Sequence, residues 1–183
     1  MNHNPFEFDS FPFGENNEPF SGGAGDFYRS EAFRYFQEGY QKQTEGVLEE
    51  AIRLYQKSIE IYPTAEAHTF LGWAYSFQRR YEDAIAECRK AIEVDPDFGN
   101  PYNDIGAYLI ERDKLDEAIP WLEKATHAKR YESYCFPHYN LGRVWERKGD
   151  WARAAECYQN ALRENSDYAL AVRALTRLKG MMN

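Results

Sequence analysis

The feature that most constrains this chain is a set of residues that recurs at intervals of 33 to 36 positions. A glycine occurs four times in this register, and an alanine follows each glycine after twelve positions. A large residue or a cysteine comes four positions later, and a serine or alanine three positions after that. The four columns are Gly39, Gly72, Gly106 and Gly142; Ala51, Ala84, Ala118 and Ala154; Tyr55, Cys88, Leu122 and Tyr158; and Ser58, Ala91, Ala125 and Ala161. Such self-similarity indicates stacked repeats that bury one continuous core.

The sizes of the repeated residues predict what each unit is. Small residues at fixed positions let two antiparallel helices approach closely, and the larger residue on the same helix face fills the space between them. Pro63 and Pro96 end the first two units, because proline cannot continue a helix. The pattern therefore predicts an all-α chain built from helical hairpins.

These columns and the closing prolines resemble the tetratricopeptide repeat, a helix–turn–helix unit of about 34 residues. The resemblance implies a right-handed superhelical solenoid of four hairpins within a domain at 31–183. The expected units are about 32–64, 65–98, 99–134 and 135–168, and a capping helix is expected at about 168–180. In that helix the residues expected to face the fourth unit are Leu170, Val172, Leu175 and Leu178.

The sequence departs from the family pattern at two places. Glu38 stands where the first unit should have a large apolar residue. The third unit lacks the closing proline and has two extra residues near Lys129–Tyr134, which predicts a longer turn before the fourth unit.

Residues 1–30 have a different composition and are expected to form a disordered tail. Proline and glycine interrupt every short run, and no helical periodicity is present. Phenylalanines alternate with acids in this segment, which suggests either a short adhesive motif or a solvated leader. The phenylalanines are Phe6, Phe8, Phe11, Phe13 and Phe20, and the interleaved acids are Glu7, Asp9, Glu15 and Glu18.

Composition excludes several classes of partner. The net charge is −8, and only residues 141–183 have more basic than acidic residues, eight against five. This balance argues against binding to nucleic acid or to an anionic membrane. No apolar run reaches the roughly 20 residues that span a bilayer, and no basic stretch followed by an apolar segment marks a secretory signal. The three cysteines are not arranged as a disulfide framework. We therefore expect a cytoplasmic protein.

No catalytic or metal-binding motif is present, so the sequence predicts a protein that is not an enzyme and needs no cofactor or metal. His68 and His138 are expected to be packed rings, and Cys88 and Cys157 to be small apolar fillers. Cys135 opens the fourth unit and could be exposed, but no base stands beside it in the sequence.

In the tetratricopeptide family the first helix of each hairpin lines a concave groove, and the resemblance implies such a groove here. Its N-terminal half would be aromatic and its C-terminal half polar, with two arginines to pair with acids on a ligand and with Asn103 and Asn140 to bond a peptide backbone. The alternative is that the rings pack on neighbouring helices and close the groove. The candidate peptide-binding residues are Phe36, Tyr40, Phe70, Trp73, Asn103, Asp104, Tyr139, Asn140, Arg143 and Arg147.

The leading hypothesis is a non-catalytic adaptor that binds a protein or peptide partner, for which a segment rich in phenylalanine and acids would suit the groove. A second hypothesis is a scaffold that forms a homo-oligomer, in which the N-terminal tail occupies its own groove or that of a neighbour. A third is a small acidic chaperone of exported proteins. The family's clamp for a chaperone carboxylate is not expected, because its cationic positions hold other residues here.

Overall fold

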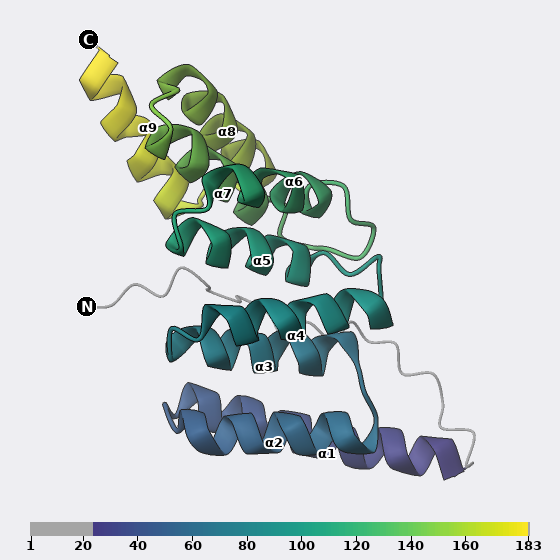
Figure 1. Cartoon of the computed structure of the whole chain (residues 1–183). Coiled ribbons are helices and arrows are strands. Elements are labelled where there is room, and N and C mark those ends of the chain that lie inside the picture. Colours follow the sequence, from purple (N-terminus) through teal and green to yellow (C-terminus); the bar gives the residue numbers. More distant parts are fainter. Residues whose placement is uncertain (1–23, 183) are drawn as a thin grey trace.

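The computed structural model describes residues 24–182, and the predictions about the phenylalanines and acids of residues 1–23 lie outside this part. Within the described range the chain forms nine α-helices and no strand (Figure 1). They are α1 (Ala24–Thr44), α2 (Leu48–Ile61), α3 (Ala65–Phe77), α4 (Tyr81–Val94), α5 (Asn100–Glu111), α6 (Leu115–Ala125), α7 (Cys135–Arg147), α8 (Trp151–Glu164) and α9 (Ala169–Met182).

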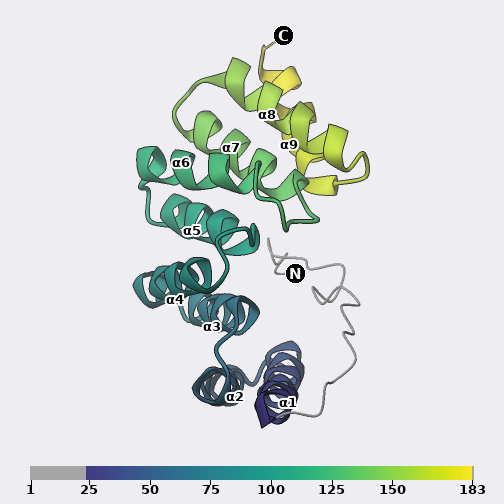
Figure 2. The same ribbon diagram turned by 90° about the vertical axis from the view of Figure 1, so that its right-hand side faces the viewer.

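The helices pair as antiparallel hairpins, α1 with α2, α3 with α4, α5 with α6 and α7 with α8. Each hairpin stacks on the next, and α9 packs on α8 at the C-terminal end (Figures 1 and 2). This arrangement confirms the prediction of an all-α solenoid of helical hairpins. No helix within residues 24–182 combines the length and the apolar character needed to cross a membrane.

The repeated glycines lie where the two helices of a hairpin touch. A Cβ atom added at Gly39 would lie 2.9 Å from the ring of Tyr55, and one at Gly72 would lie 2.9 Å from the carbonyl oxygen of Ala84. At Gly142 the added atom would come within 3.0 Å of the ring of Tyr158. Close helix approach, which the sequence columns predicted, is therefore the physical reason for the glycine column.

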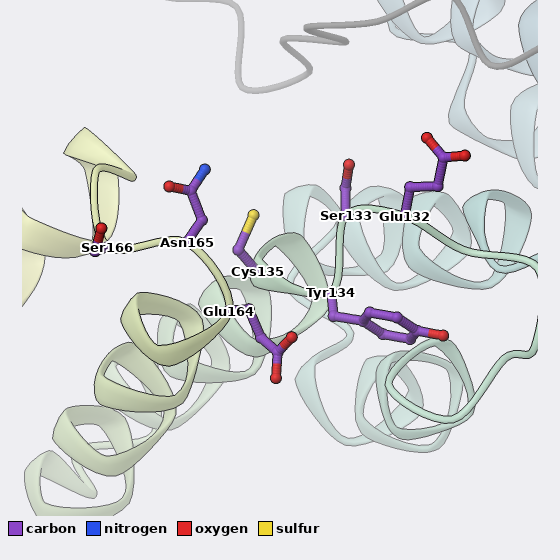
Figure 3. Close-up of a pocket in the computed structure, with 7 residues that line it drawn as sticks. All are labelled: Glu132, Ser133, Tyr134, Cys135, Glu164, Asn165 and Ser166. Carbon is purple, nitrogen blue, oxygen red and sulfur yellow. The ribbon is translucent and has the colours of Figure 1, made fainter.

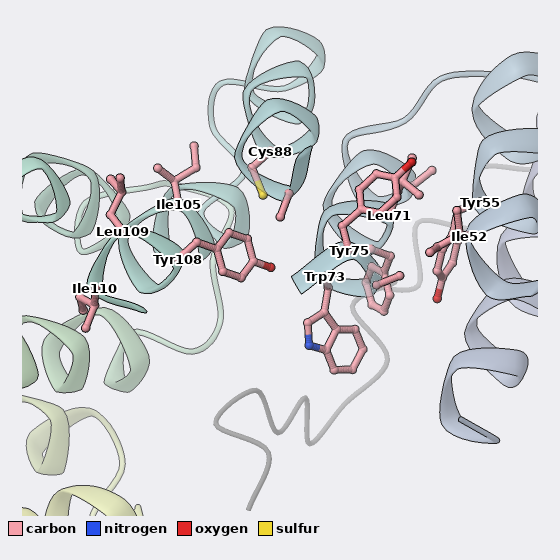
Figure 4. Close-up of a cluster of buried hydrophobic side chains, with 14 of the residues drawn as sticks. Ile52, Tyr55, Leu71, Trp73, Tyr75, Cys88, Ile105, Tyr108, Leu109 and Ile110 are labelled. Atoms are coloured by element: carbon pink, nitrogen blue, oxygen red, sulfur yellow. The ribbon is translucent and has the colours of Figure 1, made fainter. Parts of the chain in front are cut away.

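The core lies between the first and second helices of the hairpins and divides into several clusters. Its largest cluster joins residues of the first three hairpins and reaches Leu141 and Val144 of α7. Figure 4 shows part of it, with Tyr55, Cys88 and Tyr108 among the labelled side chains. A separate cluster of Tyr158, Leu175 and Leu178, with smaller neighbours, joins α8 to α9. Each hairpin thus buries its apolar face against the adjacent hairpin.

In each of the four hairpins, the turn between the two helices contains one residue with a positive, left-handed φ angle. These residues are Gly46, Arg79, Asp113 and Gly149, with φ of 80°, 59°, 60° and 79°. Each follows the glycine of the repeated column by seven positions. The column is invisible in the sequence because two of its four members are not glycine, although glycine adopts this conformation at the lowest cost.

The turn between α6 and α7, residues 126–134, is long and folds back on the turn between α4 and α5. The backbone N–H of Gly99 donates to the carbonyl of Arg130 at 3.0 Å, and that of Arg130 donates to the carbonyl of Asp97 at 2.9 Å. The Arg130 guanidinium pairs with Glu66 and with Asp95, each at 2.7 Å, and lies 4.0 Å from the ring centre of Phe98. We call these contacts of Arg130 the turn clasp.

The first helix starts earlier than expected. The sequence placed residues up to 30 in a disordered tail, but α1 begins at Ala24, directly after the Gly22-Gly23 pair. Asp26 lies in the first turn, where an acid stabilises the positive end of a helix. Phe27 and Tyr28 are 67% and 53% exposed, so this turn buries little and leaves no amphipathic pattern to detect.

The last helix presents a different face from the one expected. Leu175 and Leu178 are buried as predicted, but Val172 is 43% exposed and Ala171 is buried in its place. Positions 171, 175 and 178 lie four and seven residues apart on one helical stripe, whereas position 172 does not. The helix also continues past Gly180 to Met182.

Candidate functional site

The predicted binding residues lie on α1, α3, α5 and α7, the first helices of the four hairpins. Side chains of neighbouring first helices meet directly: Phe36 of α1 contacts Phe70 of α3, and Asn140 of α7 bonds to Asn103 of α5. We call the surface formed by these four helices the first-helix face. It divides into an aromatic part on α1 and α3 and a polar part on α5 and α7.

Five rings form the aromatic part, which we call the aromatic cluster: Phe36, Tyr40, Phe70, Trp73 and Phe77. The ring centres of Phe36 and Phe70 are 5.1 Å apart, and those of Tyr40 and Phe70 are 5.7 Å apart. The series continues from Phe70 to Trp73 at 5.6 Å and from Trp73 to Phe77 at 5.3 Å. Most of these pairs are edge-to-face, a geometry that adds to simple area burial.

Burial separates the rings of this region into two groups. Phe36 and Phe70 are each only 2% exposed and Trp73 is 7% exposed, so these three rings belong to the core. Phe33 and Phe77 are 39% and 44% exposed. The alternative from the sequence, that some rings pack on a neighbouring helix, therefore describes Phe36 and Phe70. The accessible aromatic surface lies at Phe33 and Phe77, two positions that the repeat register also assigns to the groove.

The polar part is a row of hydrogen-bonded side chains that links α7 to α5. Arg143 donates to the amide oxygen of Asn140 at 3.1 Å, and Asn140 donates to the amide oxygen of Asn103 at 3.0 Å. Asn103 in turn donates to a carboxylate oxygen of Asp104 at 3.3 Å. We call these four residues the polar row. Asn103 and Asn140 are buried and already bonded to each other, so a peptide backbone would have to displace these bonds.

Asp104 ends the polar row in an environment unfavourable to charge. Its side chain is 2% exposed, and its second oxygen, Oδ2, has no hydrogen-bond partner among the described residues. Burial raises the pKa of Asp104 to about 7, which the hydrogen bond from Asn103 offsets only in part. This carboxyl group therefore changes its charge close to neutral pH.

The two arginines of the polar part are engaged within the chain. Arg143 pairs with Glu111 at 2.6 Å. Arg147 pairs with Asp113 at 2.9 Å and donates to the carbonyl of Ile110 at 2.6 Å. The expectation that both would be available to acids of a ligand is therefore modified, because a ligand carboxylate would have to compete with Glu111 and Asp113. Tyr139 packs against α8 and the start of α9, 5.5 Å from Tyr158 and 5.3 Å from Tyr168 between ring centres.

A cavity of about 330 Å³ lies between the start of α7 and the turn from α8 to α9 (Figure 3). None of the candidate binding residues lines it. Its lining is polar and consists of Glu132, Ser133, Tyr134, Cys135, Glu164, Asn165 and Ser166. Cys135 is 5% exposed, so the expectation that this thiol could be exposed is wrong.

Three other titratable side chains, His68, Glu87 and Cys88, take part in packing and hydrogen bonding between helices. His68 is buried and its Nδ1 lies 2.7 Å from a carboxylate oxygen of Glu87. Burial disfavours the charge of Glu87, but hydrogen bonds from His68 and Lys90 outweigh that effect and lower its pKa. Burial raises the pKa of the Cys88 thiol well above its usual value. Within residues 24–182 no group of three or more histidine, cysteine or acidic side chains is arranged to hold a metal ion.

Comparison with models of known protein families shows which family this chain resembles. Two sequence models, both described as tetratricopeptide repeat, match residues 65–98 and residues 135–168. These ranges contain the α3–α4 and α7–α8 hairpins.

Two relatives of similar sequence are longer than this chain. The type IV pilus assembly protein PilF of Pseudomonas aeruginosa is 32% identical over 132 residues, which cover 72% of this chain and 52% of PilF. Tetratricopeptide repeat protein 29 of Homo sapiens is 28% identical over 130 residues, which cover 66% of this chain and 27% of the relative. The chain thus spans about half or less of the length of these relatives. A solved structure of Pseudomonas aeruginosa PilF aligns with a TM-score of 0.78 at 28% identity, covering 84% of this chain and 70% of that one.

Proposed function

Because the chain is a tetratricopeptide repeat protein, we propose that it is a non-catalytic adaptor that binds a segment of a partner protein on its first-helix face. The observation that carries the proposal is the aromatic cluster with its exposed edge. Phe33 and Phe77 present partly exposed rings beside a packed aromatic core, and aromatic residues are typical anchors of protein interfaces.

The chemistry of this face favours a partner segment with apolar or aromatic side chains. Full burial of one such side chain contributes about 1.5–3 kcal/mol. The edge-to-face pair of Phe70 and Trp73 and the tilted pair of Trp73 and Phe77 support an aromatic occupant beside them. Acids on the partner would contribute less than the sequence suggested, because Arg143 and Arg147 already have carboxylate partners.

The similarity to a pilus assembly protein supports a partner that belongs to a larger assembly. An adaptor in such a process holds one component while others join, which requires a rigid surface rather than a reactive group. The chaperone hypothesis uses the same face and remains an alternative. The cytoplasmic location expected from the sequence also remains a prediction.

The proposal is tested with a pair of variants that introduce the same charge at two exposed apolar positions. Phe77→Asp places a carboxylate beside Trp73 on the first-helix face. Val94→Asp places one at the end of α4, at a residue that is 47% exposed and outside that face. The full chain and both variants are used as baits in lysate of the source cells, and captured proteins are identified by mass spectrometry.

We expect a partner that binds the full chain and the Val94→Asp variant but is lost from the Phe77→Asp variant. Thermal unfolding of both variants checks that the loss does not come from unfolding. A partner that is retained equally by both variants would place the binding surface elsewhere and contradict the proposal.

A further inference from the structure

We propose that residues 1–23 bind in cis at the exposed edge of the aromatic cluster of the same chain, at Phe33 and Phe77, and so compete with the partner segment; this inference rests on the proposed function of the first-helix face. The segment precedes α1, whose own side chains Phe36 and Tyr40 form one edge of the cluster. Its sequence, the position where α1 begins and the chemistry of the face each support this occupant.

The sequence of the segment suits a face lined by rings. In an extended chain, side chains two positions apart point to the same side. Phe6 and Phe8 therefore share one side, and the acids Glu7 and Asp9 share the other. Phe11 and Phe13 share a side with each other around Pro12, which favours an extended backbone, but in a continuously extended chain this is the side of Glu7 and Asp9. Phe6 and Phe8 can thus contact the protein while Glu7 and Asp9 stay in water.

The segment is also long enough and can reverse its direction. An extended chain spans about 3.3–3.6 Å per residue, so 23 residues reach roughly 80 Å. The 21-residue helix α1 is only about 30 Å long, at 1.5 Å per residue. Gly22 and Gly23 stand directly before α1, where the proposed binding would require the chain to turn back toward Phe33 and Phe36. Glycine permits the backbone conformations that such a reversal needs.

The charge distribution allows the segment to lie on α1 and α3. Residues 1–23 contain four acidic residues and no lysine or arginine. The only acidic residue of α3 is Glu66, and its carboxylate is paired with Arg130 of the turn clasp. On α1, Glu38 is paired with Arg34 at 2.7 Å. No unpaired acid of α3 therefore repels the segment.

The test uses the full chain with the photo-crosslinking residue p-benzoyl-L-phenylalanine in place of Phe8. Irradiation followed by mass spectrometry of the peptides identifies which residues the segment contacts. We expect crosslinks to residues 33–40 of α1 and residues 66–77 of α3. Crosslinks that fall mainly on other helices, or no crosslinked product, would overturn the proposal.

Two further arms sharpen this result. An equal mixture of ¹⁴N-labelled and ¹⁵N-labelled protein distinguishes cis from trans binding, because cis crosslinks join peptides of one label only. Mixed-label pairs would overturn the cis proposal in favour of an oligomeric scaffold. Phe77→Asp should lower the crosslink yield about two- to fivefold, since about 1 kcal/mol changes an equilibrium constant about fivefold. Val94→Asp should leave the yield unchanged, and an equal loss in both variants would count against the site.

The outcome can be separated from that of the adaptor proposal. If no crosslinks form but a partner is lost from the Phe77→Asp variant, the adaptor proposal stands and the tail proposal fails. If crosslinks form as expected but no partner depends on Phe77, the tail proposal stands and the adaptor proposal fails.

Discussion

Gly142 lies against the ring of Tyr158, and nothing larger than a hydrogen atom fits between the two helices at that point. Gly180, in contrast, has open space where a Cβ atom would stand, and it lies near the exposed end of α9. The same substitution at these two glycines therefore separates packing from helix propensity.

Gly142→Ala is expected to lower the free energy of unfolding by about 1–3 kcal/mol, the usual cost of an overfilled core. Gly180→Ala is expected to raise it slightly, by at most about 1 kcal/mol, because alanine is the better helix former. Urea denaturation followed by circular dichroism measures both. An equal effect of the two substitutions would show that Tyr158 relaxes freely and that close approach does not explain the glycine column.

The buried carboxyl group of Asp104 should make the stability of the fold depend on pH. Its pKa is about 7 in the folded chain and near 3.8 when unfolded, so the unfolded state ionises first as the pH rises. The stability that the neutral carboxyl group provides is fully present below about pH 4 and is lost as the pH rises through 7. Between pH 5 and pH 8 this group alone should lower the free energy of unfolding by roughly 2–3 kcal/mol.

The variant Asp104→Asn removes the charge and keeps the shape, so its unfolding free energy should fall less over this pH range than that of the unaltered chain. Denaturation curves at pH 5, 6, 7 and 8 give the difference, in which the contributions of the other titrating groups cancel. Parallel pH profiles for the two proteins would mean that Asp104 is ionised throughout.

At the scale of the element, the hairpins were predictable because their columns of small residues reflect direct contacts such as Gly39 on Tyr55. The left-handed turn residues were not, because Arg79 and Asp113 are residue types that tolerate other conformations as well. The start of α1 was missed because Phe27 and Tyr28 are exposed and leave no periodic signal. Hydrophobicity alone selected Val172, whereas the buried stripe of α9 uses the small Ala171.

The candidate site was predicted less well than the fold. Its helices and residue positions follow from the repeat register, but burial and pairing depend on neighbouring helices. Sequence alone does not show that Phe70 is enclosed by Phe36, Tyr55 and Trp73. The pairing of Arg143 with Glu111 joins residues 32 positions apart on adjacent hairpins. The spacing of about one repeat is the signal that could have suggested this ion pair.

The turn clasp makes a prediction for the long turn before α7. Arg130 is 42% exposed, so its ion pairs are partly screened, and Arg130→Ala is expected to cost about 1 kcal/mol in total. The loss should be local: the amide of Gly99, which donates to the Arg130 carbonyl, should exchange its hydrogen faster.

Hydrogen exchange measured by NMR tests this expectation, with Lys129→Ala as the control. Lys129 pairs with Asp97 but is 81% exposed, so its removal should change the free energy of unfolding by less than about 0.5 kcal/mol. Equal effects of the two substitutions would indicate that the backbone bonds alone hold the turn.

At the scale of the whole molecule, a stack whose helices pack within their own hairpin or against an adjacent one should lose stability locally. Leu178 of α9 is fully buried against the α8 layer, and Leu178→Ala is expected to cost about 2–5 kcal/mol in that region. Hydrogen exchange with mass spectrometry should show faster exchange in α7–α9 and little change in α1–α4. Val172→Ala, at an exposed position of the same helix, is the control. Uniformly faster exchange along the chain would contradict local unfolding.

The turn clasp also has a mechanical consequence. The curvature of a stack of hairpins changes through small rotations between adjacent hairpins. Arg130 joins the α6–α7 turn to Glu66 at the start of α3, a connection across 64 residues that crosses the boundary between the second and third hairpins. The ion pairs of Arg130 oppose rotation of the second hairpin against the third. A partner laid along the first-helix face would therefore have to break the contacts of Arg130 to rotate these two hairpins against each other.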